Sequence, residues 1–373
     1  MANFLQKIFQ ISSSASSNSG SVVGIDIGTS SIKAVELHRK GGRAVLETYG
    51  ELSLAPYGDM PVGSITNLST DVLARAIKDI IRESKISTTN ASISLPASSS
   101  MIFILELPLS IKEDKLKEVV PIEARRYIPI PISEVTLDWW MIPQNDIPTE
   151  YTDGLTKEDK TEVLVVAIHN DTMNKYREIF EKSGLTGGLF EIEIFSSMRS
   201  SIGHDLSTVL LADFGASKTK IVIVESGVVK KFHIINRGAA DITANISKAL
   251  DLSFARAEEM KKEFGLSGLE TGLNKNLAEV AKLEIDHILS EMSEIMSSYE
   301  RKREMVIRKI IIVGGGALLK GLFSLISNMF KTDVVMGNPF AKAEAPKFLD
   351  SVLSEISPPF SASVGLAIKK LEN

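Results

Sequence analysis

The stretch Asp26-Ile27-Gly28-Thr29-Ser30-Ser31-Ile32-Lys33 decides the fold, because a second copy follows later as Asp213-Phe214-Gly215-Ala216-Ser217-Lys218-Thr219-Lys220. Asp, Gly, Ser and Lys match in register in the two copies, and each copy lies between two apolar runs. An apolar run, a small polar turn that contains glycine and a second apolar run predict a β-hairpin. The chain is therefore expected to contain two equivalent hairpins.

Two such turns that face each other can hold the phosphate groups of a nucleotide. Glycine lets backbone N–H groups approach a phosphate because no Cβ stands in the way, and hydroxyl groups add further donors. Lys33 and Lys220 either add positive charge or point away from the site. The expected phosphate-binding residues are Gly28, Thr29, Ser30 and Ser31 in the first copy and Gly215, Ser217 and Thr219 in the second.

The two aspartates suit a different task. Mg²⁺ keeps most of its water in proteins and is usually held by one or two carboxylates together with phosphate oxygens. Asp26 and Asp213 are therefore predicted to bind Mg²⁺ through water. The alternative is a pair of unrelated turns in which Asp and Gly serve turn geometry alone, and the duplication argues against it.

Composition narrows the class of protein. A chain of 373 residues with 44% hydrophobic and 24% charged residues is typical of a globular protein with two domains. The net charge of −5 and the lack of a basic stretch argue against nucleic acid as a partner. Without cysteine there is no disulfide and no thiolate metal site, and the five histidines are scattered. No apolar run is long enough to span a membrane.

Residues 1–20 differ in composition from the rest. An apolar stripe at helical spacing is followed by a stretch rich in Ser, Asn and Gly; the stripe consists of Phe4, Leu5, Ile8, Phe9 and Ile11. Two interpretations remain open, a flexible leader or a short helix that binds a partner or a membrane surface.

The order of the predicted elements repeats along with the turns. In the first half, three strands precede a helix over 71–84 and a strand over 91–95; in the second, three strands precede a helix over 241–250 and a strand over 309–313. This order predicts an α/β fold with two duplicated ribonuclease-H-like domains around a nucleotide cleft. The first domain is expected to comprise 21–96, 189–207 and 357–373, and the second 208–356, with a small helical part around 244–275.

An α+β insertion is expected between the two copies, over 97–188. Its predicted elements are a strand over 101–107, a helix over 112–127, a strand with Trp139 and Trp140, a strand over 163–168 and a helix over 170–183. The polar residues 144–160 are predicted to form an exposed loop.

A third nucleotide element follows the strand 309–313, where Gly314-Gly315-Gly316 is expected to precede a helix. Glycine lets the backbone approach a flat ring and a ribose, and the N-terminus of a helix offers free amides. The segment is not the dinucleotide motif G-x-G-x-x-G, because Leu319 stands where the third glycine would be, and the chain has no P-loop.

The two hairpin turns and the glycine triplet, in this order, resemble the actin-like ATPase superfamily, which includes actin, DnaK-type chaperones, sugar kinases and FtsA. The resemblance implies binding of ATP with Mg²⁺, with Ala216 added to the second phosphate loop and Gly314, Gly315 and Gly316 at the adenosine. It also implies two connecting helices, over 194–201 and 361–370, whose small residues Ala362, Gly365 and Ala367 suit a close crossing. Glu193 is implied as the residue that orients an attacking water, or else as a ligand of magnesium-bound water or a helix cap.

The insertion resembles one family in particular. Glu123-Ala124-Arg125-Arg126-Tyr127-Ile128-Pro129-Ile130-Pro131, followed by Glu134-Val135-Thr136-Leu137-Asp138, is similar to the signature of the PilM family of type IV pilus assembly proteins. The resemblance covers about 22–371. It implies a cytoplasmic ATP-binding adaptor that lies at the inner face of the cytoplasmic membrane through its partners.

In that family the cytoplasmic N-terminal tail of PilN binds in a groove between the first domain and the insertion. Carried over by position, the groove lies near the strand over 101–107 and includes Tyr127, Ile128, Pro129, Ile130 and Pro131. The same prolines can also serve only to stiffen the turn, and both roles are compatible.

The alternatives are an FtsA-like filament-forming protein and a metabolite kinase of the same superfamily. The chain stops at Asn373 without the C-terminal amphipathic helix of FtsA, which argues against the first. One segment departs from the superfamily pattern: Glu294-Ile295-Met296-Ser297-Ser298, in a long helix over 277–303, lacks the usual basic residue. Arg301, Lys302 and Arg303 are expected to form a solvated helix end. We expect at most a weak ATPase activity.

Overall fold

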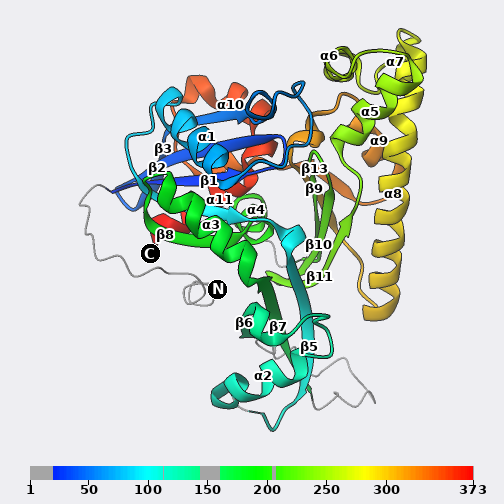
Figure 1. The fold of residues 1–373 in the computed structure, drawn as a ribbon. Coiled ribbons are helices and arrows are strands. Elements are labelled where there is room, and N and C mark those ends of the chain that lie inside the picture. Colours follow the sequence, from blue (N-terminus) through cyan, green and yellow to red (C-terminus); the bar gives the residue numbers. More distant parts are fainter. Residues whose placement is uncertain (1–19, 112, 143–159, 204–206, 373) are drawn as a thin grey trace.

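The computed structural model describes residues 20–111, 113–142, 160–203 and 207–372. The N-terminal apolar stripe and most of the expected loop over 144–160 lie outside these ranges. The described chain forms two five-stranded sheets, each with its own helices, and a three-stranded sheet that extends beneath both (Figure 1). The part built on the first sheet is called the first lobe, and the part built on the second sheet the second lobe.

The two large sheets have the same topology. The first has the order β3-β2-β1-β4-β8 and the second the order β11-β10-β9-β12-β13, with the first three strands antiparallel and the others parallel. The strands of the first sheet are β1 Ser21–Ile27, β2 Ser31–Lys40, β3 Arg43–Ser53, β4 Asn90–Leu95 and β8 Thr186–Ile192. Those of the second are β9 Val209–Phe214, β10 Thr219–Glu225, β11 Val228–Ile235, β12 Lys309–Val313 and β13 Asp333–Met336. The predicted repeat of the first four strands is confirmed.

Both predicted hairpins are present and have the same register. Asp26 pairs with Lys33 across β1 and β2, and Asp213 pairs with Lys220 across β9 and β10. At the turns, the amide of Gly28 donates to Ser31 O and the amide of Gly215 donates to Lys218 O, each over 3.0 Å. The two copies of the motif therefore fold into the same turn.

Helices cover both faces of the first sheet. One face packs against α1 (Thr70–Glu83) and α3 (Asn170–Lys182), and the other packs against α11 (Ser361–Glu372), which lies against α4 (Glu193–Ser201). The helix α1 buries one stripe of its surface, and the hydroxyl of Ser69 caps it by accepting a hydrogen bond from the amide of Val72. The short α10 (Asp350–Ile356) precedes α11.

Small residues allow α11 to lie between the sheet and α4. A Cβ at Gly24 on β1 would overlap the backbone of Ser363, and a Cβ at Gly365 would overlap the carbonyl oxygen of Ser196 on α4. The expected close crossing at Gly365 is confirmed. Ser197 on α4 and Ala362 on α11 line the cleft, so the two helices meet beside it.

The second lobe places its helices on the outer face of its sheet (Figure 1). They are α5 Ala239–Ala249, α6 Phe254–Phe264, α7 Gly268–Thr271, α8 Lys275–Arg303 and α9 Leu322–Met329. The inner face, with Leu211, Val222 and Val313, shares one apolar core with Ile194 on α4. The two lobes are therefore joined by a continuous core beneath the cleft.

The insertion forms the third sheet, antiparallel and in the order β5-β7-β6, with one helix against it. Its elements are β5 Ser100–Pro108, α2 Leu116–Ala124, β6 Val135–Met141 and β7 Lys160–His169. The predicted helix over 112–127 ends early, at Ala124, because the amides of Tyr127 and Ile128 turn back onto its carbonyl and Ile128 precedes a proline. The helix α3, expected within the insertion, packs on α1 and on the first sheet.

Candidate functional site

A cavity of about 660 Å³ lies between the two lobes. Its volume is within the roughly 300–1,000 Å³ that is usual for small-molecule sites. The walls include nearly all residues predicted for nucleotide binding: Asp26, Gly28, Thr29, Ser30, Ser31, Glu193, Asp213, Gly215, Ala216, Ser217, Gly314, Gly315 and Gly316. Thr219 does not line the cavity; it is buried, and its hydroxyl donates to Arg237 O over 2.9 Å.

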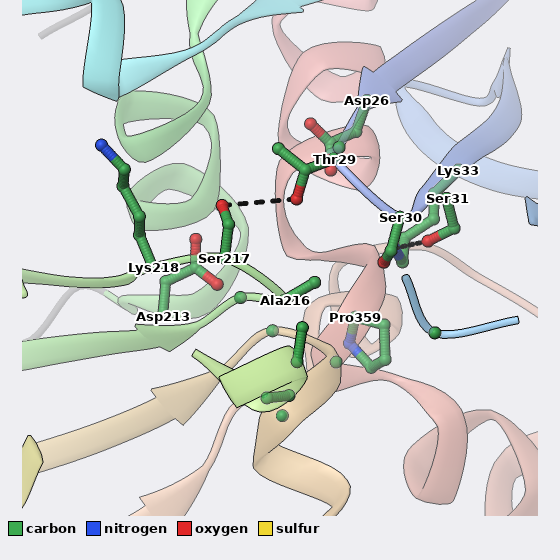
Figure 2. Close-up of a pocket in the computed structure, with 18 of the residues that line it drawn as sticks. Asp26, Thr29, Ser30, Ser31, Lys33, Asp213, Ala216, Ser217, Lys218 and Pro359 are labelled. Atoms are coloured by element: carbon green, nitrogen blue, oxygen red, sulfur yellow. Dashed lines mark hydrogen bonds between the residues drawn. The ribbon is translucent and has the colours of Figure 1, made fainter. Parts of the chain in front are cut away.

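The two hairpin turns meet in this cavity. The hydroxyl of Thr29 donates to that of Ser217 over 3.4 Å, so the tips of the two turns touch across the cleft (Figure 2). A group bound beside this contact reaches amides and hydroxyls from both lobes.

A side chain would have a different consequence at each of the three glycines after β12. A Cβ at Gly314, where φ is +87°, would overlap Asp213 Oδ1, and a Cβ at Gly316 would lie 2.9 Å from Phe214 O. Protein packing therefore explains both. No atom lies within 4 Å of a Cβ built at Gly315, which lines the cavity. The space beside Gly315 is thus available to a bound molecule.

The helix expected after the triplet is present, but it does not begin at the triplet itself. Residues Gly315–Leu318 form a 3-10 turn, and α9 begins only at Leu322, after Gly321 adopts a φ of +84°. The left-handed backbone at Gly321 separates the turn from the helix. The N-terminus of α9 therefore does not supply the amides next to the triplet.

The floor of the cleft holds a buried group of charges centred on Lys220. Its Nζ lies 2.8 Å from Glu193 Oε2 and 2.9 Å from Asp213 Oδ2. Burial on its own would lower the pKa of Lys220, but the two carboxylates raise it above its ordinary value, so the ammonium stays charged. Lys220 points into the cavity, which decides between the two orientations left open by the sequence.

Both carboxylate oxygens of Glu193 have a hydrogen-bond partner. Oε1 accepts a hydrogen bond of 2.9 Å from the amide of Ala97, and Oε2 binds Lys220. Burial raises the pKa of the Glu193 carboxyl, and Asp26 and Asp213 add to this effect while Lys220 opposes it. The carboxylate is therefore fixed in the first turn of α4 by partners on both sides.

Asp26 has different neighbours. Its Oδ1 accepts a hydrogen bond of 2.7 Å from Ser94 on β4, and among the described residues it forms no salt bridge. Lys33, at the same hairpin position as Lys220, instead lies 2.7 Å from the Ser31 hydroxyl and 3.2 Å from Glu51 Oε1. Burial raises the pKa of Glu51, but Lys33 and Ser31 lower it to a net value below normal.

Three charged residues on α6 also line the cavity, and sequence reasoning did not identify them: Glu258, Lys261 and Lys262. The buried Lys261 lies 2.7 Å from Glu258 Oε2 and 2.8 Å from the Thr243 hydroxyl, and burial lowers its pKa although Glu258 opposes this. Gly63 of the first lobe packs against Glu258, so the rims of the lobes touch. The spacing of i, i+3 and i+4 could have indicated a single charged face.

The predicted partner groove lies on the insertion. Tyr127 is 53% exposed and stacks on Phe103 of β5, with ring centroids 4.9 Å apart. Ile128 is only 5% exposed and packs with Ala124, Val135 and Ala167, so it belongs to the core of the insertion. Pro129 and Pro131 are exposed, and a shallow hollow lies beside them, lined by Arg125, Ile130, Pro131, Ile132 and Ser133.

The end of α8 is not simply solvated, contrary to the expectation for Arg303. Its guanidinium lies 2.6 Å from Glu162 Oε1 on β7, and Lys230 on β11 binds the other oxygen of Glu162. Glu162 therefore links the insertion to the second lobe through two ion pairs. The segment 294–298 of the same helix does not line the cavity.

Within the described ranges, no cluster of three or more acidic or histidine side chains is arranged to hold a metal ion directly. A magnesium ion held through water at Asp26 is compatible with this. The helices of the same ranges include none with the length and apolar character needed to cross a membrane.

Two repeated sheets around a central cleft, with this order of loops, define an actin-like ATPase fold. The family model described as type IV pilus assembly protein PilM matches residues 24–371, and the chain belongs to this family. The resemblance inferred from the Tyr-Ile-Pro-Ile-Pro segment is thus confirmed.

The chain is also similar to solved structures and to curated proteins. A PilM–PilN type IV pilus biogenesis complex matches with a TM-score of 0.78 and 22% identity, over 94% of this chain and 99% of that chain. The ethanolamine utilization protein EutJ from Carboxydothermus hydrogenoformans matches with a TM-score of 0.53 and 14% identity, over 93% and 89% of the two chains. The cell division protein FtsA of Streptococcus pneumoniae is 23% identical over 357 residues, which cover 86% of this chain and 76% of FtsA.

Proposed function

We propose that this chain is a nucleotide-binding adaptor of type IV pilus assembly, which binds ATP with Mg²⁺ in its cleft and a PilN-like membrane protein on its insertion. The observation that carries the proposal is the meeting of the two hairpin turns, at Thr29 and Ser217, in a cavity that leaves open space beside Gly315. The chain would lie at the inner face of the cytoplasmic membrane through its pilus partners, without inserting into the bilayer.

The phosphate end of the nucleotide would lie between the two turns. The amides and hydroxyls of Gly28, Thr29, Ser30 and Ser31 would face those of Gly215, Ala216 and Ser217. Bound Mg²⁺ would supply positive charge to the phosphates, and Asp26 is the carboxylate available to hold its water. Donors from both lobes on one ligand would favour the closed cleft.

The nucleoside end would lie towards Gly315 and α6. The backbone after the triplet is adjacent to the end of α6, since the amide of Leu266 donates to Lys320 O over 2.8 Å. Glu258 and Lys262 line this part of the cavity and can form hydrogen bonds with the hydroxyl groups of a ribose. The adenine ring would use the space that a side chain at position 315 would fill.

The partner would bind on the exposed part of the Tyr127–Pro131 segment. Tyr127 stacks on Phe103, which lies on the edge strand β5 of the insertion sheet, and two exposed prolines follow Tyr127 in the sequence. A rigid, partly apolar surface of this kind suits a short extended peptide. The similarity to a solved PilM–PilN complex supports the choice of the cytoplasmic tail of a PilN-like protein.

The nucleotide state would change the affinity for this partner. The insertion is continuous with the first lobe through β4 and α3, and Glu162 binds Arg303 and Lys230 of the second lobe. A change in the angle between the lobes must therefore move the insertion or break these ion pairs. Because both oxygens of Glu193 are engaged, ATP hydrolysis would be weak at most.

Calorimetric titration tests the proposal. Mg-ATP is titrated into the chain, and the N-terminal peptide of the PilN homologue from the same organism is then titrated in the presence of Mg-ATP, of ADP and of no nucleotide. We expect saturable ATP binding and a peptide affinity that differs between the three states. Absence of ATP binding would refute the nucleotide site, and equal peptide affinity in all states would refute gating.

A further inference from the structure

The side chain of Asp26 has one hydrogen-bond partner among the described residues, the hydroxyl of Ser94 at the end of β4. This hydroxyl donates to Asp26 Oδ1 over 2.7 Å and accepts a hydrogen bond of 3.0 Å from the amide of Ile27. Because the amide can only donate, the single hydroxyl proton is left for the carboxylate. Ser94 is 2% exposed, so bulk water does not compete for either hydrogen bond.

The matching aspartate of the second hairpin has a different partner. Asp213 pairs with Val313 across β9 and β12. Ser94 has the corresponding place beside Asp26, one residue beyond the last pair of β1 with β4. Val313 cannot donate a hydrogen bond from its side chain, and Asp213 is bound by the ammonium of Lys220 instead, over 2.9 Å. The duplication thus yields one aspartate with a cationic partner and one with a neutral partner.

The neutral partner leaves the charge of Asp26 without a counter-ion. Asp26, Asp213 and Glu193 all line the cavity. The ammonium of Lys220 is shared by Asp213 and Glu193, and within the described ranges no salt bridge includes Asp26. Carboxylates that are largely withdrawn from water are usually paired with a cation or coordinate a metal. The excess of negative charge therefore favours a bound cation next to Asp26, as in the magnesium site proposed above.

We propose, on the basis of the nucleotide-binding function above, that Ser94 is a positioning residue of the magnesium site. Its hydroxyl fixes Oδ1 of Asp26, and because it carries no charge it leaves the carboxylate able to attract Mg²⁺ with its bound water. Removal of outer-shell partners of this kind typically costs about 10–100-fold in metal affinity. Ser94 should therefore strengthen the binding of Mg²⁺ together with ATP and have no effect on the binding of ATP alone.

Calorimetric titration of ATP in excess EDTA and in excess Mg²⁺ tests this role. The ratio of the dissociation constant in EDTA to that in Mg²⁺ is the factor by which the protein strengthens the binding of Mg²⁺ to ATP, because the binding events form a closed thermodynamic cycle. We expect the ratio to exceed about ten in the wild type and to fall about tenfold in Ser94→Ala. The dissociation constant in EDTA should be the same for both proteins.

The matched control is Ser92→Ala in the same strand. Ser92 is fully buried, and its hydroxyl has no hydrogen-bond partner within the described part of the chain, so the ratio should keep its wild-type value. A double variant tests whether Ser94 acts through Asp26. Asp26→Asn should lower the ratio by itself, and Ser94→Ala should lower it no further when Asp26→Asn is already present.

A wild-type ratio near one, an unchanged ratio in Ser94→Ala, an equal fall in Ser92→Ala or a further fall in the double variant would overturn the proposal. If Ser94→Ala does not fold, as judged by circular dichroism, Ser94→Cys decides. A thiol fills the same place but is a weak donor, so the same tenfold fall of about one order of magnitude is expected. Failure of the wild type to bind ATP in either condition would instead refute the proposed function itself.

Discussion

Thr29 and Ser217 touch across the cleft, with their hydroxyl oxygens 3.4 Å apart, although 188 positions separate them in the sequence. Each residue is at the tip of one copy of the same hairpin, so the duplicated motif has become a contact between the two lobes. A ligand that binds beside this contact touches both lobes.

Substitution of Gly315 by valine should weaken ATP binding without loss of stability. The new side chain would enter open cavity space, since no atom lies within 4 Å of a Cβ built there. We expect at least about a tenfold loss of affinity for ATP by calorimetry. Gly314→Ala is the contrasting variant, because its Cβ would overlap Asp213 Oδ1 and its φ of +87° is strained, so it should lower the melting temperature. Normal ATP binding by Gly315→Val would show that the nucleoside lies elsewhere.

Tyr127→Ala and Ile128→Ala should separate partner binding from folding, although the residues are adjacent. The ring of Tyr127 stacks on Phe103 and is exposed to solvent. Removal of this ring should weaken binding of the PilN-type peptide by about tenfold and leave the affinity for ATP unchanged. Ile128 is buried, so its truncation should cost about 2–4 kcal/mol in the free energy of unfolding. Peptide titration and chemical denaturation of both variants distinguish the two effects. An unchanged peptide affinity in Tyr127→Ala would place the groove on another surface.

Glu162→Gln should uncouple the insertion from the second lobe. The variant loses the charge that binds Arg303 and Lys230, so the peptide affinity should respond less to the change from ADP to Mg-ATP. Glu106→Gln is the matched control, because Glu106 lies opposite Glu162 on β5 and pairs with Lys160 inside the insertion sheet, 3.2 Å away, and among the described residues it forms no ion pair with the second lobe. The same nucleotide response in wild type and Glu162→Gln would exclude this link as the route of coupling.

Stability should fall in acid through Glu191, which lies buried between β8, α4 and α11. Burial on its own would raise the pKa of Glu191, but Arg199 and Lys369, within 2.6–2.9 Å, lower it from 4.5 to about 2. Because the folded pKa lies below the unfolded value, the stabilisation is complete above the unfolded pKa and is lost as the pH falls from about 4.5 towards 2.

Denaturant unfolding across this pH range checks the effect. Glu191→Gln should lose about 3–5 kcal/mol at neutral pH, since it leaves two buried cations with a weakened partner, and its stability should vary less between pH 5 and about 2. An equally steep acid dependence in the variant would assign the effect to other carboxylates.

Gly365→Ala should destabilise the joint between α11 and α4. The added Cβ would overlap the carbonyl oxygen of Ser196, and overpacking of this kind costs about 1–3 kcal/mol or more. Gly203→Ala, which has no atom within 4 Å of its Cβ, should have little effect on the melting temperature. Equal melting temperatures for the two variants would mean that the helices can separate without cost.

Much of the fold could be read from local patterns. The hairpin turns, the glycine triplet and the long helix α8 depend on residues close in sequence, and the structure shows them where they were expected. The strands β8 and β13 were not predicted. The first begins Thr186-Gly187-Gly188, and the second has only four residues, so neither has a clear strand pattern. Their pairing with β4 and β12 comes from the sheet and not from their own propensity.

The sequence by itself determined the duplicated turns, the ligand class that they suit and the family of the chain, because a turn's chemistry is set by a few adjacent residues. Only the tertiary structure decided which charges share the cleft. Lys33 and Lys220 have the same register in equivalent hairpins, yet one binds Glu51 and the other lies between Asp213 and Glu193. Their partners come from other strands and helices, and the buried position of each ammonium makes the choice of partner a matter of three-dimensional packing.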